Sequence, residues 1–215
     1  VPTVVVPGNH DVPLYDVTAR FLQPLKRFRQ FIGCEKRSFF ADAELAVLGL
    51  NTARSLTIKN GRISFEQMRD IQRAFEAVPA AALKALVIHH PLAPPSHDLG
   101  LAPVGRWRPA LAAVAQAGIH LVMSGHYHRV YSDALTVPMS LSNTAGGSVL
   151  TVHAGTAIST RTRERESNTY NVIRTEEGHR LSVAVVAWAG TGFAEARRAE
   201  FELNGRHWCR MKFER

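Results

Sequence analysis

The sequence predicts an α/β domain in which helices cover a β-sheet. Short apolar runs rich in Val, Ile and Leu alternate with segments of helical periodicity. Three of these runs end in polar loops that contain histidine, and ligands gather outside the carboxyl ends of strands in open α/β sheets. With 215 residues, 46% hydrophobic and 20% charged, the chain can build one sizeable core. We therefore expect a single domain over residues 1–215, with a β-rich portion from about residue 148.

The first fifty residues predict three strands and a divided helix. Val4 to Val6 has the composition of a core strand. Thr18 is a candidate cap for a helical stretch that reaches about Phe31, and Pro24 should split that stretch. Residues 37–41 and 45–50 are expected to pair as strands across a polar turn at Asp42.

A helix with one buried face is predicted after Ser64. Ser64 and Gln67 have the spacing of a capping box. Apolar residues follow at intervals of three and four, which is the helical period, and Pro79 should end the helix. These apolar residues are Phe65, Met68, Ile71 and Phe75.

Alternating strands and a second helix are predicted in the next segment. Leu86 to Ile88 is a buried strand, and a helix with Pro109 in its first turn should end at Gly118. Ile119 to Met123 forms the next strand. Strands and hairpins are expected after residue 148, and residues 181–188 form the most apolar of them.

Charge and composition limit the classes of partner and compartment. The formal charge of +8 and the pI near 10.1 favour anionic partners, but leave open a small phosphate ester, nucleic acid and a merely solvated basic surface. No apolar run approaches the roughly 20 residues that a membrane helix needs, and no leader pattern opens the chain. Cys34 and Cys209 form no CxxC pair. We expect a soluble protein of a reducing compartment, the cytoplasm.

Three short motifs carry the candidate chemistry. Imidazole nitrogens together with carboxylate or amide oxygens suit Mn, Fe, Zn or Co. In the third motif two histidines flank one tyrosine, which predicts two imidazoles on one side of an extended segment. The first and third motifs each begin with a glycine, which should relax the backbone there. The motifs, in chain order, are Gly8-Asn9-His10-Asp11, His89-His90-Pro91 and Gly125-His126-Tyr127-His128.

The motifs and their order resemble those of the calcineurin-like metallophosphoesterase superfamily, and in particular its bacterial cyclic-nucleotide phosphodiesterases. The resemblance spans about residues 4–130 and implies an αββα sandwich and a metal-dependent hydrolase of phosphate esters. It also implies two divalent metal ions, with Asn9, His89 and His126 as ligands of one ion and His128 as a ligand of the other.

The resemblance further implies roles in catalysis. A metal-bound hydroxide would attack the phosphorus, and His10 would contact the phosphate and assist the leaving oxygen. We expect Asp11 to orient His10, because the two are adjacent. His90 is expected to pack or hydrogen-bond behind the site. The implied substrate is a small phosphodiester, such as a cyclic nucleotide, or a phosphomonoester; a nuclease is an alternative with the same chemistry.

The sequence departs from the family pattern at its beginning. The family has a DxH motif and then a GD motif upstream of GNHD, and neither occurs here. Those residues supply most ligands of the first ion and the carboxylate that bridges both ions. We expect an N-terminally incomplete domain that lacks its first strands. The alternative from a different class is an interaction scaffold without catalysis.

Overall fold

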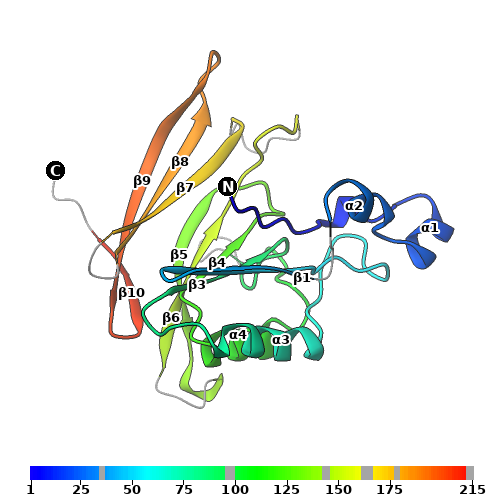
Figure 1. Cartoon of the computed structure of the whole chain (residues 1–215). Helices are drawn as coiled ribbons and strands as arrows, with labels where there is room; N and C mark the ends of the chain where they lie inside the picture. Colours follow the sequence, from blue (N-terminus) through cyan, green and yellow to red (C-terminus); the bar gives the residue numbers. More distant parts are fainter. Residues whose placement is uncertain (34–36, 95–99, 142–145, 161–166, 177–179, 212–215) are drawn as a thin grey trace.

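Three layers make up the main body of the computed structural model (Figure 1). It describes residues 1–33, 37–94, 100–141, 146–160, 167–176 and 180–211. The helices α3 (Phe65–Glu76) and α4 (Trp107–Gln116) cover one face of a six-stranded sheet, and a four-stranded sheet covers the other. The predicted α/β class and the metallophosphoesterase-type fold are confirmed.

The six-stranded sheet is mixed and has the order β1-β2-β3-β4-β6-β5. The inner strands β2, β3, β4 and β6 run parallel, and the edge strands β1 and β5 run antiparallel to their neighbours. The carboxyl ends of the four parallel strands therefore lie along one edge. The strands are β1 (Arg37–Ala41), β2 (Leu45–Leu50), β3 (Leu83–Ile88), β4 (Leu121–Ser124), β5 (Tyr131–Val137) and β6 (Gly147–His153).

The four-stranded sheet is antiparallel in the order β10-β9-β8-β7 and comes from the C-terminal part of the chain, as predicted. Two hydrophobic clusters lie on the two faces of the larger sheet: one under α3 and α4, the other between the sheets around Leu150, Leu181, Phe201 and Trp208. The strands are β7 (Thr169–Glu176), β8 (Arg180–Trp188), β9 (Phe193–Asn204) and β10 (His207–Arg210).

Most local predictions are confirmed. The strands at 37–41 and 45–50 pair antiparallel, and the Asp42 carboxylate accepts hydrogen bonds from two backbone amides of their turn. The capping box of Ser64 and Gln67 opens α3, which buries Met68, Ile71 and Phe75. Phe65 was expected in the same face, but it is exposed and lies under the Arg106 guanidinium.

The N-terminal segment differs from its prediction. Val4 to Val6 is extended but pairs with no strand within the described ranges. The γ-methyls of Val4 and Val6 instead approach the backbone of Gly49, where an added Cβ would lie 2.7 and 3.0 Å from them. Backbone pairing needs a neighbouring strand as well as strand propensity, so the composition alone did not settle this segment.

A small lobe beside the sheets contains the 3₁₀ turn η1 (Asn9–Asp11), α1 (Val17–Leu22) and α2 (Lys26–Phe31) (Figure 1). The helical stretch is divided at Pro24 as predicted, but Asp16 rather than Thr18 caps α1 by accepting a hydrogen bond from Ala19 N–H. A short 3₁₀ turn, η2 (Met139–Leu141), precedes β6. No helix within the described ranges is long and apolar enough to cross a membrane.

Candidate metal centre

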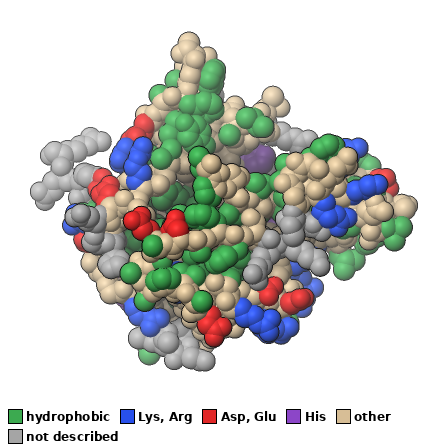
Figure 2. All heavy atoms as spheres, viewed as in Figure 1, with side chains coloured by type: hydrophobic (Ala, Val, Ile, Leu, Met, Phe, Trp, Pro, Cys, Tyr) green, Lys and Arg blue, Asp and Glu red, His purple; other side chains and the backbone are tan. Residues whose placement is uncertain are grey.

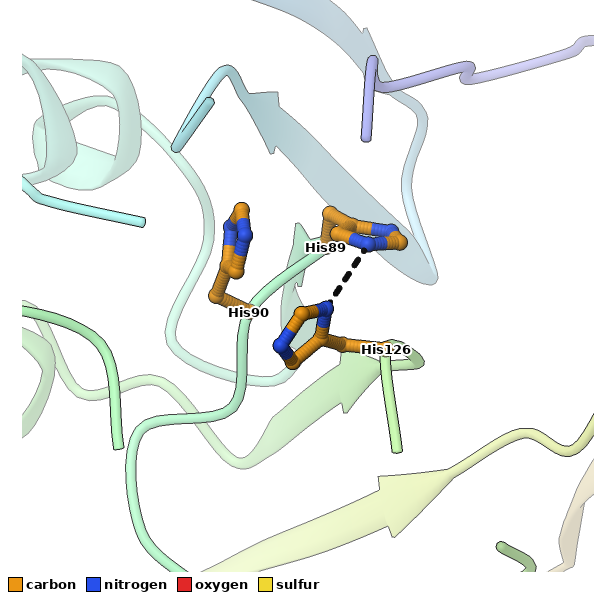
Figure 3. A group of neighbouring side chains, drawn as sticks. All are labelled: His89, His90 and His126. Carbon is orange, nitrogen blue, oxygen red and sulfur yellow. Dashed lines mark hydrogen bonds between the residues drawn. The ribbon is translucent and has the colours of Figure 1, made fainter. Parts of the chain in front are cut away.

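Three of the predicted metal ligands meet at the carboxyl edge of the parallel strands. His89 follows β3 directly, His126 follows β4, and Asn9 enters from η1. The His89 Nε2 atom lies 3.1 Å from Asn9 Oδ1. It lies 3.3 Å from His126 Nδ1, and a dashed line marks this contact in Figure 3. These residues are 80 and 37 positions apart in sequence. The fold, and no local element, brings them together.

The spacing of these atoms is that of ligands on one cation. Ligand atoms about 2.0–2.1 Å from a metal lie roughly 2.9–3.4 Å apart at octahedral or tetrahedral angles. Both observed separations fall in this interval. A neutral imidazole carries one ring proton, so His89 Nε2 cannot donate fully to two acceptors at once. A cation shared by the three side chains would fit both separations.

His89 favours its neutral form, which is the form that binds metals. Burial, followed by repulsion from His90, His126, His10 and His128, lowers the pKa of His89 to about 3. An imidazole with so low a pKa is unprotonated at neutral pH and offers a free lone pair to a cation.

His90 belongs to the same histidine cluster but has both ring nitrogens engaged elsewhere. Its Nε2 donates to the Lys59 carbonyl at 3.0 Å, and its Nδ1 accepts from the Thr52 hydroxyl at 2.7 Å. Burial, then the charge of His126, lowers the pKa of His90 to about 4. Although its ligand atoms lie within 4.8 Å of those of His89 and His126, its hydrogen bonds place it behind the site. The expected packing role of His90 agrees with this geometry.

His126 and His128 adopt a backbone conformation that the sequence did not predict. Their φ angles are 74° and 57°, in the left-handed region. The segment is thus not extended as predicted, although both histidines line the same cavity. A non-glycine residue in this region costs about 1–3 kcal/mol, and such strain gathers at functional sites. Gly125 is not among the residues with positive φ, so the strain falls on the histidines themselves.

Gly8 matters because it has no side chain, and its backbone conformation does not require glycine. Its φ of −97° and ψ of 178° are open to any residue. A Cβ there would lie 2.8 Å from His89 Cε1 and 3.0 Å from His89 Nδ1. The absence of a side chain at Gly8 therefore lets the imidazole of His89 sit against the backbone of the first motif.

His10, Asn9, His126 and His128 line one cavity of about 760 Å³. The cavity opens beside the small lobe, where Figure 2 shows histidine atoms at the surface. The Asp11 carboxylate accepts a hydrogen bond of 2.8 Å from Gly8 N–H. Its effect on His10 remains a prediction.

Sequence reasoning did not single out several residues of this site. Thr52 follows β2 at the same sheet edge, and this position was its only signal. Lys59 and Ile58 come from a loop without a motif, and both line the cavity. Tyr127, the middle residue of the third motif, is buried and donates its hydroxyl proton to the Ala102 carbonyl at 2.8 Å.

Comparisons with known proteins agree with the fold and the motifs. The sequence profile of calcineurin-like phosphoesterases matches residues 1–130. The chain belongs to the calcineurin-like phosphoesterase family.

Among solved structures, the chain is similar to the purple acid phosphatase PPD1 from seeds of yellow lupin (Lupinus luteus). The TM-score is 0.55 at 12% sequence identity, over 87% of this chain and 38% of the lupin chain. The chain therefore spans well under half of that phosphatase, and the likeness supports the fold. No curated protein sequence matches the chain.

Proposed function

We propose that the chain is a metal-dependent phosphoesterase that holds a divalent cation between Asn9, His89 and His126. The observation that carries the proposal is the approach of Asn9 Oδ1 and His126 Nδ1 to the same nitrogen of His89, at 3.1 and 3.3 Å. The family and the fold are those of metal-dependent phosphoesterases. A bound divalent cation would activate water and neutralise charge on the phosphate.

The residues around the cation site are proposed to bind the phosphate and to protonate the leaving oxygen. His10 is exposed in the same cavity and is our candidate to contact the phosphate and protonate the leaving oxygen. Lys59 and Arg129 also line the cavity and supply positive charge toward the anionic oxygens. We assign Asp11 to holding the turn that carries His10, through its bond to Gly8.

A second cation is part of the proposal, with His128 as its ligand. No described residue that lines the cavity carries a carboxylate. The first ion therefore has three candidate ligands and the second has one. Because affinity follows ligand number and charge, we expect the two ions to bind with different affinities.

The experiment is hydrolysis of bis-p-nitrophenyl phosphate across a Mn²⁺ titration, with p-nitrophenyl phosphate in parallel to separate diester from monoester activity. Turnover should rise and saturate with Mn²⁺. It should be lost in His126→Ala and kept in His207→Ala, whose histidine is exposed in β10. Turnover without metal, or equal turnover in His126→Ala, would contradict the proposal. A folded chain that neither binds Mn²⁺ nor turns over substrate would favour the scaffold alternative.

A further inference from the structure

The helix α1 has its polarity reversed. Arg20 is only 6% exposed, whereas Val17 and Phe21 of the same helix are 66% and 52% exposed. Surface helices normally bury their apolar face and expose their charges. A reversed helix next to a candidate active site indicates that its apolar residues serve something outside the folded chain.

The buried arginine holds the surrounding loops in place. Its Nε donates to the Ser55 carbonyl at 2.7 Å, Nη1 to the Pro13 carbonyl at 2.7 Å, and Nη2 to the Thr57 carbonyl at 2.8 Å. Each carbonyl precedes an apolar residue that is exposed. Leu56 is 86% and Ile58 is 62% exposed, and Leu14 is also exposed.

These side chains form what we call the apolar rim: Leu14, Val17, Phe21, Leu56 and Ile58. Single exposed apolar residues are normal on protein surfaces, but Leu14 and Ile58 line one cavity together, and apolar groups gathered at a cavity favour a binding site. The rim is continuous with the metal centre, because Leu14 and Ile58 line the same cavity as His10 and His126.

Charge around the rim favours an anionic partner. Lys59 lies next to Ile58 and lines the cavity. Lys26 and Arg27 are exposed on α2, the helix that follows α1. In Figure 2 hydrophobic and basic side chains share the surface of this lobe with an acidic one. The surface thus offers an apolar strip that leads into a basic, histidine-lined cavity.

We propose that the phosphate ester bound at this site is amphiphilic, with its phosphate at the histidines and an alkyl or acyl chain along the apolar rim. The inference rests on the proposed phosphoesterase function and specifies the substrate class. A small polar ester would leave the rim in water, whereas an alkyl chain would cover it and keep the phosphate in the cavity.

The test compares the binding of octyl phosphate and ethyl phosphate to the intact chain by isothermal titration calorimetry, with and without Mn²⁺, below the micelle concentration of octyl phosphate. Each fully buried methylene tightens binding about fourfold. Burial of two of the six additional methylenes should therefore favour octyl phosphate about 15-fold. Equal affinities for the two phosphates would overturn the proposal.

Matched variants locate the effect. Leu14→Ser and Ile58→Ser should each lower the octyl-to-ethyl affinity ratio toward one. Met139→Ser removes an apolar side chain of η2 that is 71% exposed and does not line the cavity, and it should keep the ratio. A ratio that falls as far in Met139→Ser as in Ile58→Ser would overturn the proposal.

Two further measurements distinguish the amphiphilic substrate from a dimer interface at the rim and from failure of the proposed phosphoesterase function. Light scattering reports the oligomeric state. If the chain is a dimer, if Ile58→Ser makes it a monomer, and if octyl phosphate binds no better than ethyl phosphate, the rim is an interface with a second copy and the amphiphilic substrate class is refuted. Hydrolysis of bis-p-nitrophenyl phosphate tests the proposed function by itself. Turnover without octyl preference would leave the phosphoesterase standing and remove only the amphiphilic substrate.

Discussion

Gly8→Ala tests the metal centre with the smallest possible addition. The backbone of Gly8 is at φ −97° and ψ 178°, which alanine adopts without strain. The new methyl would lie 2.8 Å from His89 Cε1, 3.0 Å from Nδ1 and 3.1 Å from Nε2. Ordinary contacts between such atoms begin near about 3.5 Å, so the ring must move by roughly 0.5 Å or more.

A shift of that size should damage metal binding more than folding. Ligand distances in metal sites are held within about 0.2 Å, so the displaced His89 Nε2 can no longer share a cation at full strength with Asn9 and His126. We expect Mn²⁺ affinity to fall at least tenfold, or about 1.4 kcal/mol. The free energy of unfolding should change little, because loss of glycine freedom in the unfolded chain contributes about 0.4–1 kcal/mol in the other direction.

The assay is calorimetric titration with Mn²⁺, together with urea unfolding of each variant. Gly125→Ala is the matched control: it adds the same methyl next to the candidate ligand His126, but nothing lies within 4 Å of that methyl. Mn²⁺ affinity within about twofold of the original in Gly8→Ala, or an equal loss in Gly125→Ala, would refute the reasoning about the space around His89.

Two further predictions concern supports of the site. Arg20→Met removes the buried guanidinium and its three hydrogen bonds, and should lower the free energy of unfolding by about 3 kcal/mol. Urea unfolding measures this change, and an unchanged midpoint would show that Arg20 does not hold the loops. Burial lowers the pKa of His153 to about 3 from its ordinary 6.5. As the pH falls, the imidazole of His153 is therefore protonated in the unfolded chain before it is protonated in the folded chain. The contribution of neutral His153 to the free energy of unfolding is complete above pH 6.5 and is lost as the pH falls below that value. Between pH 7.5 and 5 the loss is about 2 kcal/mol. His153→Phe retains a ring that can stack on Tyr131, and its free energy of unfolding should fall by about 2 kcal/mol less than that of the original chain between pH 7.5 and 5. An equal fall in the variant and in the original chain would contradict the role given to His153.

The sequence anticipated those parts of the site that local pattern determines. Histidine-bearing loops after β3 and β4 meet because the strands are parallel neighbours, and this follows from the α/β pattern. The capping box at Ser64 is likewise local. The left-handed backbone of His126 and His128 was not anticipated, because residue preference opposes it and only the surrounding fold imposes it.

The reversed helix α1 shows the same limit. Periodicity assigns apolar residues to the core, but the core of the lobe consists of Val12, Leu25, Phe28 and Ala53, without Val17 or Phe21. Arg20 is buried because three backbone carbonyls from loops up to 37 positions away converge on its guanidinium. Two of those partners, Ser55 and Thr57, lie 35 and 37 positions away, outside any window around the helix, so the pattern of the helix alone predicts the opposite face.

The loop that carries Ile58 and Lys59 connects the apolar rim to the metal centre. Arg20 holds the Thr57 carbonyl, Asn9 Nδ2 approaches the Ile58 carbonyl at 3.5 Å, and His90 Nε2 donates to the Lys59 carbonyl. The three successive carbonyls thus have partners from α1, from a candidate ligand and from the residue behind the ligands. Because one short segment is bound from three sides, a shift of the rim displaces Asn9 and His90 as well. If both proposals hold, a change in the apolar rim should therefore also change the affinity for the cation.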